Sequence, residues 1–486
     1  MCPTVDSLLL RGARLVPVTA PAPSEPVDVL VVDGTVAAVG PALDRPRGVP
    51  ERDADGRWLI PGLWDQHTHL GQWTAASRRL DLGQARSPEE ALSIVAGAVA
   101  AQPGLPLIGQ GHRAGTWPRS VNVAELDAVS GPTPVVLVNS DCHHGWLNSA
   151  ALAALDLPPR DDVVQENEWY AAYARLGRLE PEPGPTDYRR MLAECAARGL
   201  VGLVDFEFGT TAGQWIERWR AECDLLRIRW AVYADGLATL PESLRTGVPL
   251  DGDARLTMGP LKIISDGSLG TRTAWCCEPY ADTGLMGAAN QTEEELHELL
   301  ALAVDRGLEV ATHAIGDRAV TSALAAYAAT GARGSVEHAQ LILPEDVVEL
   351  ARLGLRASVQ PAHLLDDRDV SERVWPGRAD RCFALRWMLE AGVDVVMGSD
   401  APVAPLDPWL AIDVAVHRSA DERGPWGADQ ALTRVEALRA SVDGQPTVGV
   451  GSRGDLVLLD HDPLVTPHLR EMASALTVVA GRIVHE

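Results

Sequence analysis

A repeated alternation of apolar runs with alanine- and leucine-rich stretches constrains the fold of this chain more than any other feature. Eight of the apolar runs have the length and composition of β-strands: residues 59–69, 200–208, 228–235, 260–267, 307–317, 334–340, 355–363 and 393–402. The stretches between several of them, such as 292–306 and 344–353, carry carboxylates near their starts, as helices do. Eight strand–helix units in succession predict an α/β protein with a closed parallel (β/α)8 barrel of the TIM type.

Both ends of the chain are rich in predicted strands. Residues 7–18 and 27–40 have strand-like composition, and Asp33-Gly34 is a signal for a tight hairpin turn. Residues 455–460 and 475–486 have the same character at the other end. We therefore predict that the two ends pair into one small β-sandwich domain, with two unrelated terminal sheets as the alternative.

A long insertion separates the first two predicted barrel strands. Residues 71–195 break the alternation and are too long to be a connecting loop, so we expect them near the mouth of the barrel. The predicted domains are then residues 58–443 for the barrel, and residues 1–57 with 444–486 for the β-sandwich.

The composition disfavours several classes of partner. The 486 residues carry a formal charge of −25, which argues against binding to nucleic acids or anionic membranes, and a small molecule is the expected partner. We find neither a secretory signal pattern nor an apolar run of transmembrane length. Seven scattered cysteines, an odd number, indicate reduced thiols and a cytoplasmic location. The oligomeric state is left open, with a homodimer as one alternative.

Two histidines end the first predicted barrel strand. Residues 58–70 read WLIPGLWDQHTHL, and positions two apart in an extended strand share a face, so His67 and His69 point the same way. Two imidazoles held together at the end of a buried strand form a ready pair of ligands for zinc. For this motif alone, two hydrogen-bonded core histidines explain the sequence equally well.

Polar side chains also close the later strands of the repeat. In chain order, the residues at the strand ends are His67, His69, Lys262 with Asp266, His313, His338 and Asp400. Each has a structural explanation on its own, such as a histidine bonded to backbone or an aspartate that caps a helix. Because functional residues of such barrels lie at the carboxyl ends of the strands, the whole series predicts one site.

Lys262 is the only lysine in the sequence, beside 41 arginines. A buried lysine near two divalent ions can react with CO2 to form a carbamate, whose two oxygens bridge the ions. Arginine cannot replace it, because the guanidinium stays protonated. The structural alternative is a buried lysine that pairs with Asp266 or Asp400.

Several motifs together resemble a known family. They are PGLWDQHTHL, NSDCHHGWLNSAAL, LKIISDGSLGTRTAWCCEPYAD, ATHAIGDRAV, SVEHAQLILPED, ASVQPAH, MGSDAPV and the terminal GDLVLLD and VAGRIV. On these motifs, which span almost the entire chain, the sequence is identified as a member of the amidohydrolase superfamily, in its YtcJ-like (amidohydrolase family 3) branch. The resemblance implies a (β/α)8 barrel, a β-sandwich built from both termini, and a hydrolytic metal site.

The resemblance also assigns roles to residues. The metal ligands that it implies are His67, His69, Lys262, His313, His338 and Asp400. The implied general base is Asp400, and the implied bridge between two ions is a CO2-derived carbamate on Lys262. Alternative bridging ligands are Glu166 and Glu168, and candidates for contact with substrate are His143, Trp146, Arg272 and His363.

The implied reaction is hydrolysis of a non-peptide, amide-type carbon–nitrogen bond, as in an N-acyl amine, an N-formyl amine or a cyclic amide. Two divalent ions, with zinc expected and a single ion as the alternative, activate a hydroxide, and Asp400 transfers the proton to the leaving nitrogen. Two other functions stay open. One is a mononuclear deaminase of a heterocycle, in which Lys262 is not carbamylated. The other is a non-catalytic scaffold, which would have lost ligands that this chain retains.

Overall fold

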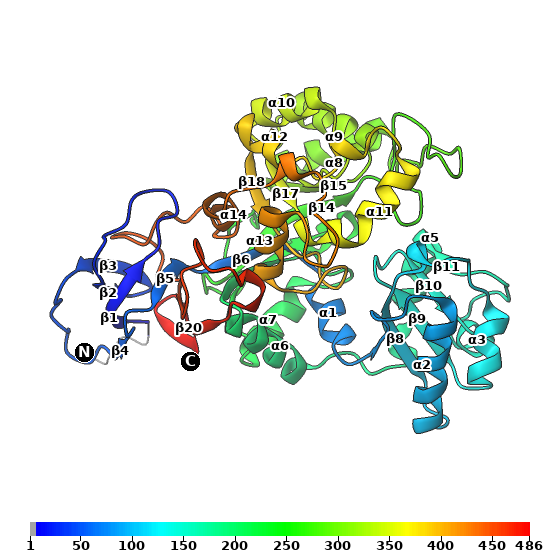
Figure 1. The fold of residues 1–486 in the computed structure, drawn as a ribbon, viewed down its shortest axis with the longest axis horizontal. Coiled ribbons are helices and arrows are strands. Elements are labelled where there is room, and N and C mark those ends of the chain that lie inside the picture. The colour runs from blue at the N-terminus through cyan, green and yellow to red at the C-terminus, as the bar shows by residue number, and fades with distance from the viewer. Residues whose placement is uncertain (1–5) are drawn as a thin grey trace.

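The computed structural model describes residues 6–486, and its centre is a barrel of eight parallel strands (Figure 1). The barrel strands are β6 (Leu63–Thr68), β12 (Leu200–Asp205), β13 (Arg227–Val232), β14 (Leu256–Ile264), β15 (Val310–Ala314), β16 (Gly334–His338), β17 (Arg356–Val359) and β18 (Asp394–Met397). Their order in the sheet is their order in the chain, and every neighbouring pair is parallel.

The barrel closes where the chain after β18 runs beside β6. The backbone N–H of Asp400 donates to the carbonyl oxygen of His67 at 2.7 Å. The N–H of Ser399 donates to a carboxylate oxygen of Asp65 at 2.9 Å. We call these interactions the closing contact, and with them the predicted (β/α)8 barrel is confirmed.

Helices cover the outside of the barrel. They are α1 (Leu70–Ala76), α6 (Pro185–Ala197), α7 (Ala212–Arg220), α8 (Glu293–Arg306), α9 (Asp317–Thr330), α10 (Pro344–Leu353), α11 (Leu364–Val374), α12 (Leu385–Glu390), α13 (Pro408–His417) and α14 (Arg434–Ala440). In the part of the chain that the structure describes, none of the helices has both the length and the apolar character needed to cross a membrane.

Helix α8 illustrates how local sequence fixes these elements. Thr292 and Glu295 form a reciprocal capping box at its start, and Gly307 ends it in the left-handed conformation with a φ of 65°. Leu296 and Leu300, one turn apart, are buried on the face that packs against the barrel. The cap therefore sets where the helix begins, and the apolar spacing sets which side faces inward.

Strands from both ends of the chain form a second sheet, as predicted. It contains β1 (Leu8–Leu15), β2 (Val27–Val32), β3 (Thr35–Gly40), β4 (Glu51–Asp53), β5 (Trp58–Pro61), β19 (Leu456–Leu459), β20 (Ser474–Val479) and β21 (Arg482–His485). The order is β21-β20-β19-β5-β1-β2-β3, with β4 beside β1, so the two ends meet where β5 pairs with β19.

The predicted strand over residues 59–69 divides into two strands of different sheets. Its first part, β5, belongs to the terminal sheet, and the barrel strand begins only at Leu63. Gly62 lies between them, where a Cβ atom would stand 2.3 Å from a methyl group of Val201. Only glycine fits there without displacing a neighbour, so the chain passes closely from one sheet into the other.

The insertion contains a third sheet, which lies on the opposite side of the barrel from the terminal sheet (Figure 1). Its elements are β7 (Leu80–Asp81), α2 (Pro88–Ala101), β8 (Leu107–His112), α3 (Val123–Ser130), β9 (Val135–Asn139), β10 (His144–Leu147), α4 (Ser149–Ala154), β11 (Val164–Gln165) and α5 (Glu166–Tyr173). Helix α6 follows and returns to the barrel, since Met191 and Leu192 pack in the barrel core.

Candidate active site

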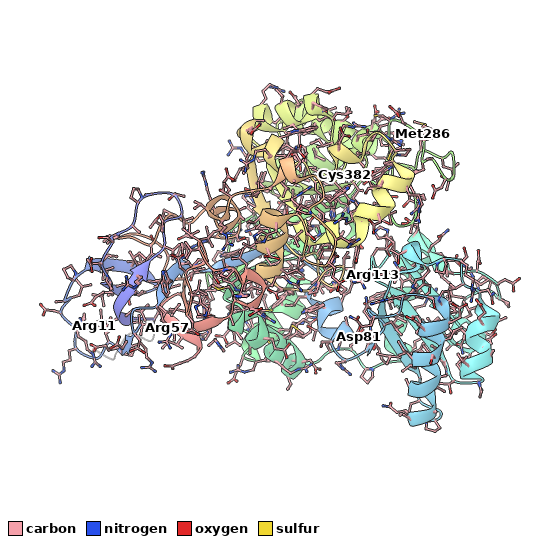
Figure 2. All side chains as sticks on the ribbon, viewed as in Figure 1. Arg11, Arg57, Asp81, Arg113, Met286 and Cys382 are labelled. Atoms are coloured by element: carbon pink, nitrogen blue, oxygen red, sulfur yellow. The ribbon has the colours of Figure 1, made fainter. Side chains whose placement is uncertain are left out.

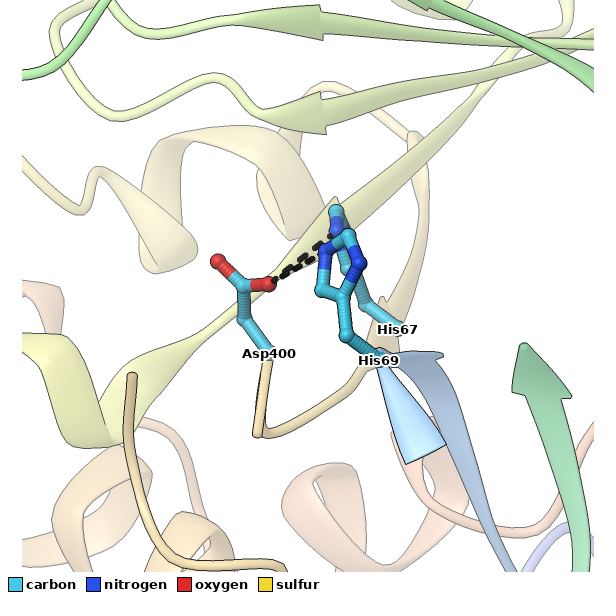
Figure 3. Close-up of side chains that lie close together, drawn as sticks. All are labelled: His67, His69 and Asp400. Atoms are coloured by element: carbon cyan, nitrogen blue, oxygen red, sulfur yellow. Dashed lines mark ion pairs between the residues drawn. The ribbon is translucent and has the colours of Figure 1, made fainter. Parts of the chain in front are cut away.

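Three side chains from the two sides of the closing contact meet at the barrel mouth (Figure 3). The Nε2 atoms of His67 and His69 each lie 3.3 Å from Oδ1 of Asp400. All three residues are buried. Each offers one ligand atom, and these three atoms lie within 4.8 Å of one another. Two imidazoles and a carboxylate in this arrangement are a donor set for a divalent ion.

The backbone fixes this geometry. Asp400 adopts the left-handed conformation, with a φ of 56°, and the N–H of His69 donates to the carbonyl oxygen of Ala401 at 2.9 Å. At Gly398 a Cβ atom would lie 2.6 Å from the backbone nitrogen of His67, so glycine allows the last strand to approach the first. The contact that closes the barrel also positions the three donors.

A second donor group shares Asp400 and adds His338 and His363. His338 ends β16 with a φ of 69°, and His363 lies in a short 3-10 turn (Pro361–His363) after β17. Within residues 6–486, Nδ1 of His338 and Nε2 of His363 are buried and have no hydrogen-bond partner. His363 was expected to contact substrate; the structure groups it with the donor residues, and its contact with substrate stays a prediction.

His313 lies beside this second group. Its ring centroid is 4.5 Å from that of His338. Its Nε2 atom already lies 3.2 Å from the carbonyl oxygen of Gly267 and 3.4 Å from Oδ1 of Asp266. The described residues do not bring His313 into either group, and its role as a ligand stays a prediction.

Glu337 is a residue that the motif analysis did not place in the site. Its Oε2 atom lies 2.7 Å from Nδ1 of His67, and both side chains are buried. Burial opposes ionisation of Glu337, but the hydrogen bond from His67 and the charge of Lys262 outweigh it and lower the pKa of Glu337. A carboxylate on Nδ1 orients the imidazole and leaves Nε2 free for a metal. The only signal in the sequence was a carboxylate directly before the predicted ligand His338.

Lys262 lies in the barrel interior next to these residues. Its Nζ atom is 3.2 Å from Nε2 of His67 and 4.2 Å from the centroid of the Phe206 ring. Burial lowers the pKa of Lys262 to about 8, against the opposing effect of the Glu337 and Asp400 charges. A larger share of this amine than of an exposed lysine is therefore in the neutral form, which is the form that reacts with CO2.

The structure does not support pairing of Lys262 with Asp266. The carboxylate of Asp266 instead accepts the backbone N–H groups of Ile315, Gly316 and Trp275 at 2.9 to 3.0 Å. These bonds tie the loop after β14 to the loop after β15. Asp266 is therefore a residue that holds backbone in place.

The protonation states suit a cation. Burial and the charge of Lys262 lower the pKa of His67 to about 4, and burial lowers the pKa of His338. Burial opposes ionisation of Asp400, but the histidines around it, His67 first, hold its pKa well below its usual range. Neutral imidazoles and an ionised carboxylate are the forms that bind metal.

A cavity of about 110 Å³ lies beside the donors, between the barrel and the insertion. Asp141 and His143 of the insertion line it together with His338, His363 and Asp400. The insertion thus forms one wall of the candidate active site, and His143 lies where substrate contact was expected.

Glu166 contacts His143 from α5. Its Oε2 atom lies 3.2 Å from Nδ1 of His143, and its Oε1 accepts from the hydroxyl of Thr273 at 2.9 Å. It thus links the insertion to the loop after β14. Glu168 lies apart, since its exposed carboxylate pairs with Arg160 at 2.9 Å, and the structure excludes it as a bridging ligand.

Two other predicted contacts need correction. Trp146 is fully buried in the core of the insertion, where its Nε1–H donates to the carbonyl oxygen of Asn122 at 2.8 Å. Arg272 is not among the residues that line the cavity, and its guanidinium pairs with Asp282 at 3.0 Å and with nearby carbonyl groups. Packing in one case and a local ion pair in the other explain these residues.

Comparisons with known proteins agree with this geometry. The model of the "Amidohydrolase family" matches residues 51–485. The chain is 27% identical to "Putative amidohydrolase YtcJ" of Bacillus subtilis (strain 168) over 524 aligned positions, which cover 94% of this chain and 96% of that one. It is 24% identical to the N-substituted formamide deformylase of Arthrobacter pascens, with 94% of each chain covered.

A solved structure is similar over the same extent. The crystal structure of an uncharacterized metal-dependent hydrolase from Pyrococcus horikoshii OT3 superposes with a TM-score of 0.79 at 25% identity. The match covers 96% of this chain and 99% of that one, so it includes the barrel, the terminal sheet and the insertion.

Proposed function

The chain belongs to the amidohydrolase family and is a hydrolase of non-peptide carbon–nitrogen bonds, and we propose that it cleaves the amide bond of an N-acyl or N-formyl amine with a divalent metal. The observation that carries this proposal is the meeting of His67, His69 and Asp400 at the mouth of the barrel, next to a cavity. The similarity to a formamide deformylase supports the choice of N-formyl amines.

The residues present fit a metal. Nδ1 of His338 and Nε2 of His363 are buried without a partner in the described chain, and such atoms normally have one. The nitrogen and carboxylate donors of the two groups suit zinc, which we propose as the ion. When bound, a divalent ion supplies a Lewis acid that polarises the amide carbonyl and lowers the pKa of water.

The protein residues supply the proton transfers. Asp400 stays ionised because of the histidines around it, so a carboxylate oxygen can take the proton of the attacking water and deliver it to the leaving nitrogen. Glu337 holds His67 in one orientation through Nδ1. The buried walls, with His67 and Lys262 at most 2% exposed, exclude bulk water from this region.

We also propose that Lys262 carries a carbamate. The lone pair of the neutral Nζ attacks the carbon of CO2, an N–C bond forms as one C=O π bond breaks, and water takes the proton that Nζ releases, which leaves a carbamate anion. This anion would stand near Nε2 of His67 and would add two oxygen donors to the site for a second ion. A single ion with an unmodified Lys262 would instead favour the alternative function, a mononuclear deaminase of a heterocycle.

Metal content per chain, with the intact mass of the loaded protein under native conditions, tests the metal and the carbamate together. We expect up to two metal ions per chain, and a mass that exceeds that of the chain with its metal by one CO2. Asp400→Asn should keep the circular dichroism spectrum of the folded parent. Its turnover of N-formyl amines should fall by about 10²–10⁴-fold, which is the contribution of a general base. Full activity in Asp400→Asn would exclude this base, and a protein that takes up no metal would exclude the whole proposal.

A further inference from the structure

The charges that line the active-site cavity do not balance. Four aspartates line it, Asp141, Asp366, Asp367 and Asp400, against two basic side chains, Arg113 and His143, and His143 pairs with Glu166 at 3.2 Å. Arg113, labelled in Figure 2 where the insertion faces the barrel, already pairs with Asp366 at 2.7 Å. Asp400 belongs to the donor groups. Two carboxylates, those of Asp141 and Asp367, are left facing the cavity.

Neutral groups hold the carboxylate of Asp367 in place. This residue lies on α11, and its Oδ2 accepts from the side-chain amide of Gln340 at 2.7 Å. Within residues 6–486, the structure contains no ion pair to Asp367 at 4.0 Å or less. The amide fixes the position of the side chain but supplies no positive charge. Burial and the charge of Asp366 raise the pKa of Asp367 to about 7, so a bound cation would favour its ionised form.

Asp141 is held in a similar way from the insertion. Its Oδ1 accepts from the side-chain amide of Asn139 at 2.7 Å and from the backbone N–H of His143 at 3.0 Å. Nδ1 of His144 lies 3.9 Å from the same oxygen. Burial opposes ionisation of Asp141, but the charges of His144 and His143 and these hydrogen bonds outweigh it and lower the pKa of Asp141, so this side chain is a carboxylate. At Gly270 a Cβ atom would lie 2.2 Å from Oδ2 of Asp141, so glycine keeps space for this oxygen.

Two buried nitrogen atoms without a partner also face this cavity. His363, only 9% exposed, lines it, and its Nε2 has no partner among the described residues. His338 lines the same cavity with an unpartnered Nδ1. The cavity is therefore lined by the donor histidines and by two carboxyl side chains, those of Asp141 and Asp367, that have no arginine or lysine partner among the described residues.

Resting on the proposed amide hydrolysis, we propose that the substrate carries a positively charged group, an ammonium or a guanidinium, which Asp141 and Asp367 bind while the amide lies at Asp400. In a partly buried cavity the interaction of two opposite charges is much stronger than in water. Charge-assisted hydrogen bonds from the cation would use the lone pairs that the neutral amides leave free. The enzyme would thus select amides with a short cationic arm over neutral ones of the same shape.

Three matched formamides test the selection. N-formylputrescine is cationic, N-formylpentylamine replaces its ammonium with a methyl group, and N-formyl-γ-aminobutyrate is anionic. We expect kcat/KM to fall about tenfold or more from the first to the second, as loss of a hydrogen bond to a charged group predicts. Added salt should reduce the ratio, since the cavity is partly open to solvent.

Variants then assign the selection to the two carboxylates. Asp367→Asn and Asp141→Asn should each bring the ratio of kcat/KM for the cationic and neutral substrates towards one. Asp369→Asn is the matched control, because Asp369 lies on the same helix with its side chain 67% exposed and pairs with Arg423. It removes the same charge outside the cavity, and the ratio should not change.

Binding of putrescine, measured by calorimetry, separates this inference from the proposed reaction. We expect Asp367→Asn and Asp141→Asn to weaken putrescine binding about tenfold or more, and Asp369→Asn to leave it unchanged. If no formamide is hydrolysed but this pattern appears, the cation site stands and the proposed reaction fails. If formamides are hydrolysed with equal ratios in the parent and both cavity variants, or putrescine does not bind, the inference is overturned.

Discussion

Replacing Glu337 with glutamine isolates what one buried carboxylate contributes to the donor group. The substitution keeps the shape of the side chain and an oxygen that can accept from Nδ1 of His67, but removes the charge. In the folded protein both side chains are 1% exposed and the atoms are 2.7 Å apart, so solvent screens the interaction little. Glu337→Gln therefore tests the orientation of His67 without opening a cavity.

The magnitude follows from this contact. A hydrogen bond to a charged group contributes about 1.5–3 kcal/mol, and loss of such a partner lowers the metal affinity of a histidine site about 10–100-fold. We expect the dissociation constant of zinc to rise by that factor in Glu337→Gln. Titration of the metal-free protein against a chromophoric chelator measures it, and circular dichroism verifies the fold.

The control is Glu309→Gln. Glu309 directly precedes β15, and its side chain is 37% exposed and pairs with Arg356 at 2.6 Å away from the donors. This variant also loses one carboxylate near the barrel and should bind metal like the parent. An unchanged affinity in a well-folded Glu337→Gln would refute the claim that this carboxylate orients His67.

Three further predictions concern other parts of the molecule. Lys262→Arg should lose metal and activity because arginine forms no carbamate. An added short carboxylate should partly restore the activity of Lys262→Ala. If Lys262→Arg bound as much metal as the parent, the proposed carbamate would be wrong. Burial, with the charge of Asp366, raises the pKa of Asp367 to about 7 in the folded protein. Between the lower pKa of this carboxyl in the unfolded chain and about pH 7, ionisation of Asp367 therefore destabilises the folded protein increasingly as the pH rises. In urea unfolding, the free energy of unfolding of Asp367→Asn should exceed that of the parent slightly near pH 4 and by on the order of 2–4 kcal/mol at about pH 8. An equal gain at the two pH values would refute this reasoning. Gly62→Ala should cost about 1–3 kcal/mol because its Cβ would meet Val201, whereas Gly97→Ala within α2, with open space around it, should be neutral or stabilising in the same assay.

The strand ends were predictable because their chemistry is local. Several of the apolar runs carry a polar residue at or just beyond the end of the strand, and the carboxyl ends of parallel strands meet at one edge. That argument brings His67, His69, His338 and Asp400 to the same place, and the structure has them there. It needs no knowledge of how the strands are staggered.

Contacts across the barrel were not predictable in this way. Glu337 on β16 reaches His67 on β6, and these strands are not neighbours in the sheet. Such a pairing depends on the tilt and stagger of all the strands, which single-strand patterns do not contain. His363 was predicted as a substrate contact but not as a member of the donor group, because β17 ends at Val359 and the histidine lies in the 3-10 turn that follows.

In the insertion, the direction of side chains decided which expectations failed. His144 and Trp146 are two apart on β10, so they share the face that packs into the core. Glu166 and Glu168 are two apart on a helix, so they lie on different faces, and only Glu166 faces the barrel. Both rules are simple, but they apply only once the element type is known.

The closing contact joins parts of the chain that are synthesised far apart, since Asp65 and Ser399 are separated by 334 positions. Bringing two ends of so long a loop together costs about 6 kcal/mol of chain entropy in an unlinked polymer. An ion held by His67, His69 and Asp400 would act as a reversible crosslink across that loop, and its binding energy would oppose unfolding of the whole barrel. Metal supply would then govern not only how fast this protein works but how long each copy survives.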